Sequence, residues 1–191
     1  MIEEINNEPR DLKEEFNKIL NNLKIKGEKY NDLDFPADES SLIGNWNDNT
    51  KRIRDIVEEW KQFKWIRSGD IPCLNNPKLG ELAIFKDSIE PQDVKMGRLK
   101  DAYYISVLAA IAEHPNRIRN MFMSDTIHRE GIFGVKVYKN GEETLVTIDN
   151  MFPCKNRKPC FSRATSNELW PLILEKVWAK LHGNYEAIIE G

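Results

Sequence analysis

Apolar residues recur at helical spacing in three segments of the chain, residues 10–26, 53–63 and 165–181. Each segment keeps its charged and amide side chains off the apolar stripe, which predicts three amphipathic helices. The stripes are formed by Leu12, Phe16, Ile19, Leu20 and Leu23, by Ile53, Ile56, Val57, Trp60 and Phe63, and by Trp170, Ile173, Leu174, Val177, Trp178 and Leu181. An isolated helix of this length is only marginally stable, so the first stripe packs either on its own domain or on another chain.

The third of these helices has a recognisable start. Thr165 followed three residues later by Glu168 has the form of a capping box, in which both side chains satisfy free backbone N–H groups. Pro171 falls in the first turn, where a helix tolerates the missing N–H. The sequence therefore predicts a helix over Thr165–Leu181.

Residues 103–112 form the most apolar stretch of the chain. Nearly every position is apolar or small (YYISVLAAIA), and a helix that is apolar on all sides is predicted to be buried. Asp101 stands where an N-cap would, and Pro115 ends the stretch. The N-terminus of such a helix stabilises an anion and lowers the pKa of a thiol, so it is a suitable place for chemistry.

An alternating pattern replaces the helical one after a short predicted helix at residues 116–123. Residues 131–138 and 143–149 read as two strands, and Asn140-Gly141 between them is a strong signal for a tight hairpin turn. A further short strand is predicted at residues 81–85. Helices around one buried helix, together with a small antiparallel hairpin, predict an α+β fold.

The composition argues against a nucleic-acid binder, a membrane-spanning protein and a secreted disulfide scaffold. Hydrophobic residues make up 40% and charged residues 31%, as in a soluble globular chain. The net charge of −3 is not segregated, so no nucleic-acid partner is expected. No apolar run approaches the roughly 18 residues that a membrane span needs. Three cysteines and an acidic, polar N-terminus argue against a secreted disulfide scaffold and favour the cytoplasm.

Four segments together resemble the calpain family of papain-fold cysteine proteases. YNDLDFPADESSL resembles the family's entry segment, and FKDSIEPQDVKMGRLKDAYYISVLAAIAEHP resembles its nucleophile segment. GIFGVKVYKNGEETLVTIDNMFP matches its hairpin, and NELWPLILEKVWAKLHGNYEAIIEG its closing helix. The resemblance covers residues 30–191, the first, cysteine-bearing subdomain of the protease core, in which the helix at residues 103–112 is the central one. Residues 1–29 are expected to form an N-terminal helical extension.

The resemblance also shows where this chain departs from the family. Calpains place their nucleophile in Q-G-x-L-G-D-C-W, and the matching segment here is MGRLKDAY. The oxyanion-hole Gln falls on Met96, the nucleophilic Cys on Ala102 and the Trp on Tyr103, while Lys100 replaces a Gly. A methyl group cannot attack a carbonyl, and a thioether donates no hydrogen bond to an oxyanion. We therefore interpret the chain as a pseudoenzyme.

A second deficit is independent of the first. Calpains take their catalytic His and Asn from a second subdomain, which would begin where this sequence ends, at Gly191. His114 precedes the Pro that ends a helix, His128 falls in a polar loop, and His182 is placed at a helix C-terminus, where a cation interacts well with the dipole. None of the three is expected to act as a catalytic base.

A calcium site is the one part of the family's chemistry that the matching residues could retain. The resemblance implies carboxylate ligands from Asp93 and Glu168, with main-chain carbonyls of Lys86 and Ser88. Calcium takes six to eight oxygen ligands, which loop carbonyls and water could complete. The simpler alternative is that Glu168 only closes its capping box and Asp93 only lies on a loop.

Three functions follow from these observations. The leading hypothesis is an inactive docking module in a larger protein assembly, such as a cytoskeletal one, with protein partners and no assigned cofactor. The second is a calcium-binding pseudoprotease that regulates an active calpain. The third, with least support, is one part of a calcium-dependent cysteine endopeptidase, because it would need a nucleophile that this sequence does not offer.

Overall fold

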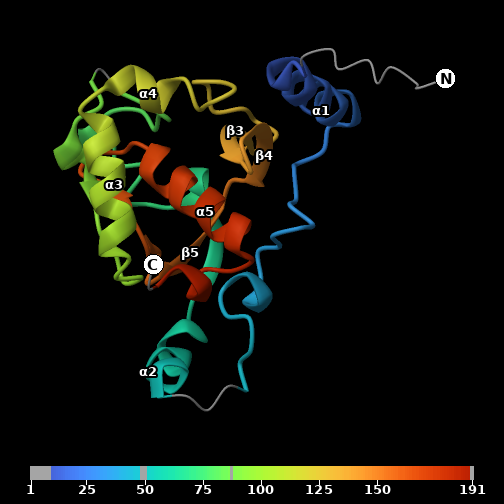
Figure 1. The fold of residues 1–191 in the computed structure, drawn as a ribbon. Helices are drawn as coiled ribbons and strands as arrows, with labels where there is room; N and C mark the ends of the chain where they lie inside the picture. The colour runs from blue at the N-terminus through green and yellow to red at the C-terminus, as the bar shows by residue number, and fades with distance from the viewer. Residues whose placement is uncertain (1–9, 48–50, 87, 190–191) are drawn as a thin grey trace.

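The computed structural model describes residues 10–47, 51–86 and 88–189. Figure 1 shows the hairpin and helix α3 on opposite sides of helix α5. The α-helices are α1 (Leu12–Lys26), α2 (Lys51–Trp60), α3 (Ala102–Ala112), α4 (Pro115–Arg119) and α5 (Trp170–His182). Short 3-10 helices occupy Glu39–Ser41, Ser68–Asp70, Pro77–Leu79, Pro91–Asp93 and Glu186–Ile188. The α+β class is confirmed.

The strands form three small antiparallel sheets. They are β1 (Lys64–Arg67), β2 (Val94–Lys95), β3 (Ile132–Lys139), β4 (Glu142–Asp149), β5 (Met151–Lys155), β6 (Lys158–Pro159) and β7 (Arg163–Ala164). The sheets have the orders β1-β5-β6, β2-β7 and β3-β4. The predicted hairpin is β3-β4, and both turn residues adopt a positive φ, 54° at Asn140 and 84° at Gly141. That geometry matches the twist of the flanking strands.

Helix α1 packs on its own domain, so the first of the two alternatives for its apolar stripe is confirmed. Asp11 caps the helix through its side chain, which accepts from the backbone N–H groups of Lys13 and Glu14. Phe16 is 1% exposed and lies against the hairpin at Gly134, where a Cβ would come within 2.5 Å of the Phe16 ring. The stripe is therefore not free for another chain. The proposed division after residue 29 stays a prediction.

The buried helix at the centre of the fold is α5, and not α3 as the sequence predicted (Figure 1). Nine of the residues of α5 are buried, whereas α3 buries only Leu108 and Ala112. Tyr103 and Val107 on α3 are 36% and 54% exposed. An apolar composition on all sides thus does not mean burial here, because no element within the described residues packs over one flank of α3.

Two local predictions near α5 are wrong. The segment at residues 81–85 forms no strand and makes only a single bridge between Ala83 and Glu168. The capping box is absent, because α5 begins at Trp170 after Leu169, which makes no side-chain cap. The hydroxyl of Thr165 instead donates to Asp93 at 3.1 Å. Tertiary pairing of this segment with the loop at residues 83–93 takes the place of local capping.

The helices that the structure describes do not include one that is long and apolar enough to cross a membrane. This agrees with the absence of a long apolar run in the sequence.

Candidate functional site

Helix α3 begins at Ala102, whose side chain is exposed. The preceding loop is held against the segment before β7, since the backbone N–H of Arg98 donates to the carbonyl of Cys160 at 2.8 Å. Gly97 lies so close to the carbonyl of Phe161 that a Cβ there would collide with it. Lys100 has a φ of 63°, in the left-handed region where glycine is at ease. The backbone at position 100 therefore keeps a conformation suited to Gly, although the residue there is Lys.

The two other positions matched to catalytic residues are on the surface but have different surroundings. Met96 is 45% exposed. The hydroxyl of Tyr103 donates to the carbonyl of Ile188 at 3.0 Å and accepts from the indole N–H of Trp178 at 3.2 Å. Tyr103 thus ties the start of α3 to the C-terminal segment.

Directly before Ala102, the structure buries a carboxyl group that has no donor. Asp101 is fully buried, and among the described residues neither of its carboxylate oxygens receives a hydrogen bond from a donor group. Glu175 of α5 is 1% exposed and accepts from the backbone N–H of Ser162 at 2.9 Å. Burial raises the pKa of Asp101 to about 6 and raises the pKa of Glu175 well above its usual value. The two carboxyls interact, and the charge of Asp101 adds to the rise in the pKa of Glu175.

Sequence analysis missed this carboxyl pair. It placed Asp101 as an N-cap, yet its side chain makes no cap hydrogen bond in the structure. A signal was present, because Glu175 and Lys176 interrupt an otherwise apolar segment of α5, and both are buried. Charged residues inside such a segment indicate buried ionisable groups with partners.

Replacing Asp101 with asparagine is expected to change how stability depends on pH. The folded chain binds the Asp101 proton more tightly than the unfolded chain, so wild-type stability falls as pH rises from about 4 through about 6. The Asp101→Asn variant lacks this loss and should gain roughly 2–3 kcal/mol relative to wild type across that window. Urea unfolding at a series of pH values measures it. Parallel curves for the two proteins would contradict the buried-pair assignment.

Lys176, which follows Glu175 in α5, forms a buried ion pair with Asp149. Lys176 is fully buried, and its ammonium donates to a carboxylate oxygen of Asp149 at 2.6 Å and to the carbonyl of Met151 at 2.7 Å. It also lies 5.3 Å from the centre of the Trp65 ring. Burial lowers the pKa of Lys176, and the Asp149 charge opposes that shift. These contacts fix α5 to strands β4 and β5.

The three cysteines of the chain are free thiols with raised pKa values. Cys154 and Cys160 are 1% and 3% exposed, and burial raises the pKa of each to about 12. Burial also raises the pKa of Cys73, which is half-buried. A nucleophilic cysteine must be a thiolate, so these thiols are poor nucleophiles at neutral pH.

The histidines lie on three different parts of the surface. His114 is exposed at the start of α4, and the Nδ1 of His182 lies 2.9 Å from the carbonyl of Trp178 at the end of α5. His128 lies 3.0 Å from the hydroxyl of Ser124. Each therefore has a contact or a position that accounts for it without catalysis.

The two carboxylates expected to bind calcium are placed in neighbouring segments. Asp93 accepts from the backbone N–H of Glu90 at 2.8 Å, and Glu168 accepts from the backbone N–H of Lys86 at 2.6 Å. The pairing of β2 with β7 joins their segments. Both carboxylates are thus already engaged by donors of the chain.

One of the two expected carbonyl ligands already accepts a hydrogen bond from a cationic side chain. The carbonyl of Lys86 accepts from the guanidinium of Arg119 at 3.0 Å, which places a positive charge where a cation would bind. The hydroxyl of Ser88 donates to Glu90 at 3.3 Å. Across the described residues, no group of three or more His, Cys, Asp or Glu side chains could hold a metal ion. Calcium binding at the Lys86 carbonyl would require the Arg119 guanidinium to move away, and the calcium site stays a prediction.

An apolar groove of about 520 Å³ runs along the exposed flank of α3. Helix α5 and strand β3 form its other sides, and Arg117 and Lys136 contribute positive charge. Tyr104 and Trp178 stack within it, their rings 5.6 Å apart and 9° from parallel. Its apolar lining comes from Tyr104, Val107, Leu108, Ile111, Met121, Val137, Tyr138, Leu174, Val177, Trp178 and Leu181. This is the flank of α3 that the fold leaves uncovered.

Comparison with known proteins identifies the family of this domain. The model of the calpain family cysteine proteases matches residues 30–191. The calpain-type cysteine protease ADL1 of Oryza sativa subsp. japonica is 34% identical over 176 residues. Calpain-10 of Rattus norvegicus is 31% identical over 171 residues, and calpain-B of Drosophila melanogaster 29% over 183. These alignments cover 88%, 86% and 94% of this chain, respectively.

The chain spans only 8%, 24% and 18% of the lengths of these three relatives, so it corresponds to one part of each. The family model nevertheless matches most of the chain, including the loop before α3, the hairpin and α5. The chain therefore belongs to the calpain family of cysteine proteases.

Proposed function

We propose that this chain is a catalytically inactive calpain-family domain that acts as a docking module in a larger cytoplasmic protein assembly. The observation that carries the proposal is Ala102 at the first residue of α3. The family likeness puts the nucleophile there, at an exposed helix N-terminus, and a methyl group cannot form a covalent intermediate.

The two buried thiols and Met96 do not replace the missing catalytic groups. The Cys154 and Cys160 thiols are buried and have pKa values of about 12, so almost none of either is thiolate at neutral pH. Met96, which stands for the oxyanion-hole donor, has no N–H or O–H in its side chain. Catalysis would need both groups together with a base.

The apolar groove beside α3 is the docking surface in this proposal. Its lining is apolar and its rim carries Arg117, besides Lys136, which is paired with Glu143, so it suits an apolar protein segment with an acidic residue beside it. Helix α1, whose stripe first suggested docking, is not the surface, because Leu12, Phe16 and Leu20 are buried on the hairpin. A cytoskeletal scaffold is the kind of assembly we expect.

A charge placed in the groove is expected to weaken docking. Val107 is 54% exposed on α3, and the Val107→Glu variant puts a carboxylate among apolar side chains and beside the partner's acidic residues. Binding should weaken about tenfold or more. The measurement is affinity isolation from the native source, followed by titration of each identified partner against both proteins.

The matched control is Ile25→Glu, which changes an 84% exposed apolar residue on α1 outside the groove. It should bind partners as wild type does. Equal binding by the Val107→Glu variant, with its fold intact, would show that the groove is not the docking surface.

The calcium-regulated alternative has weaker support. Arg119 donates to the Lys86 carbonyl, so calcium binding would require this guanidinium to move away. Titration calorimetry separates the alternatives: heat at millimolar calcium that the Asp93→Ala variant lacks would favour the regulatory role. The enzymatic alternative requires thiol-dependent turnover in a native complex.

A further inference from the structure

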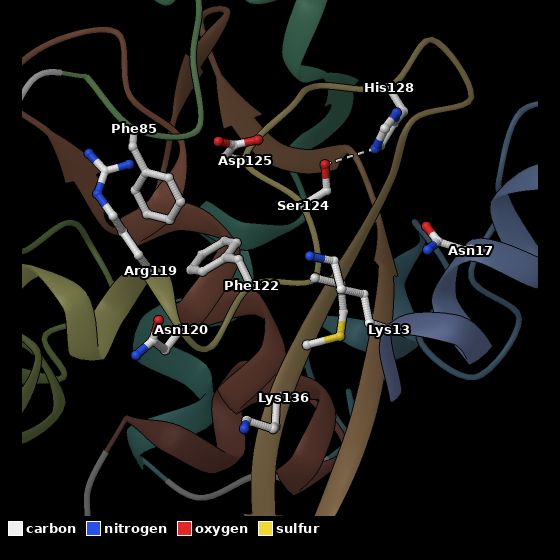
Figure 2. Close-up of a pocket in the computed structure, with 11 residues that line it drawn as sticks. Lys13, Asn17, Phe85, Arg119, Asn120, Phe122, Ser124, Asp125, His128 and Lys136 are labelled. Atoms are coloured by element: carbon white, nitrogen blue, oxygen red, sulfur yellow. Dashed lines mark hydrogen bonds between the residues drawn. The ribbon is translucent and has the colours of Figure 1, made fainter. Parts of the chain in front are cut away.

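A second cavity, of about 560 Å³, lies away from α3, between helix α1, the end of α4 and strand β3. Figure 2 shows the side chains that line it, from these elements and from the loop at residues 122–128, with the guanidinium of Arg119 beside the Phe85 ring. No residue matched to the family's catalytic or calcium chemistry at Met96, Ala102, Asp93 or Glu168 lines it.

The charges around the cavity are mostly positive. Lys13 of α1, Arg119 of α4 and Lys136 of β3 line it, and Asp125 is the only acidic residue among the lining residues. Lys136 is paired with Glu143 at 3.1 Å. Within the described ranges, neither Lys13 nor Arg119 has a carboxylate partner. Three elements thus supply cationic side chains to one cavity, with a single carboxylate in it to balance them.

Neutral hydrogen-bonding groups complete the polar side. The Nε2 of His128 lies 3.0 Å from the hydroxyl of Ser124, and both residues line the cavity (Figure 2). Burial lowers the pKa of His128, and the charge of Lys24 lowers it further, while Glu130 raises it. His128 is therefore mainly neutral at neutral pH, and an anion bound beside it would raise its pKa.

Another part of the cavity is aromatic. Phe85 and Phe122 meet edge to face with their ring centres 4.8 Å apart, and both are only half-buried. The guanidinium carbon of Arg119 lies 4.8 Å from the centre of the Phe85 ring. The Phe85 ring and the main-chain carbonyl of Lys86, to which Arg119 donates, hold this side chain in place. The aromatic part of the cavity thus carries the Arg119 charge, while Lys13 and His128 line another part of it.

We propose that this cavity binds the phosphate group of an aromatic phosphate monoester. A phosphate monoester carries close to two negative charges at neutral pH, which matches several cationic side chains better than a single carboxylate does. Arg119 and Lys13 contact the phosphate, His128 donates to it, and the ring of the ligand packs on Phe85 and Phe122. The ester is either a free small molecule or a phosphotyrosine side chain of another protein.

The test is an NMR titration of the intact chain that follows the His128 ring signals, identified with a His128→Gln variant. Phenyl phosphate should shift these signals and raise the pKa of His128. Inorganic phosphate should bind more weakly, and phenol should have no effect. A short phosphotyrosine peptide that binds more tightly than phenyl phosphate identifies a protein source, and the reverse order identifies a free ester.

Two variants on helix α1 and one in the loop at residues 122–128 test whether the ligand binds in this cavity. Lys13→Glu should weaken phenyl phosphate binding roughly tenfold or more, whereas Lys18→Glu, on a residue outside the cavity, should leave it unchanged. Asp125→Asn should strengthen it, because it removes the one carboxylate of the lining. No shift of the His128 signals with phenyl phosphate, or equal binding by wild type and the folded Lys13→Glu variant, would overturn the proposal.

Discussion

The Lys176→Met variant is expected to lose about 3–5 kcal/mol of its free energy of unfolding. Lys176 is fully buried in α5 and donates to Asp149 at 2.6 Å and to the carbonyl of Met151 at 2.7 Å. Methionine fills a similar volume but has no positive charge and no donor. The variant therefore leaves the Asp149 carboxylate, which is 2% exposed, without its counter-ion. Urea unfolding followed by tryptophan fluorescence measures the loss.

Two comparison variants show whether the uncompensated charge is the cause. Lys18→Met removes an ion pair with Glu14 on the surface, where both side chains are largely exposed, and should leave the free energy of unfolding nearly unchanged. The double variant Lys176→Met with Asp149→Asn should recover part of the loss, because it removes the charge left behind. A Lys176→Met variant as stable as wild type would contradict the assignment of this pair.

The thiol of the Ala102→Cys variant is expected to react with iodoacetamide about a thousandfold faster than Cys154 or Cys160 at neutral pH. Position 102 is exposed at the N-terminus of α3, where an ordinary or lowered thiol pKa is expected. The two native thiols are buried and have pKa values of about 12. Mass spectrometry of peptides from the alkylated protein gives the rate at each cysteine.

The same variant should still show no peptidase activity as the isolated chain. Met96 offers no oxyanion donor, and the loss of one such donor costs about 100- to 1,000-fold in rate. His114, His128 and His182 occupy surroundings that account for them without catalysis. Slow alkylation at position 102 would contradict the exposed, helix-terminal placement of this residue.

Local sequence signals predicted much of the fold. The hairpin follows from Asn140-Gly141, since a two-residue turn with positive φ at both positions fixes the strand register. The three amphipathic helices follow from their spacing, and Asp11 and Gly27 set the ends of α1. These features depend on neighbours in sequence, so the sequence contains enough information to place them.

The features that depend on tertiary contacts were not predictable in this way. The buried helix is α5 although α3 is more apolar, because burial depends on which flank another element covers. Thr165 contacts Asp93 and forms no capping box, since the pairing of β2 with β7 brings the two residues together. The Asp101–Glu175 pair joins residues far apart in sequence, and no local pattern connects them.

Peptide hydrolysis by the purified wild-type chain, measured with and without calcium and with and without iodoacetamide, decides whether the domain is catalytically inactive. An inactive domain shows no thiol-dependent turnover under any of these conditions, and a variant that lacks all three cysteines behaves in the same way. Turnover that iodoacetamide abolishes and that disappears on replacement of Cys73, Cys154 or Cys160 would contradict the inactivity of the domain.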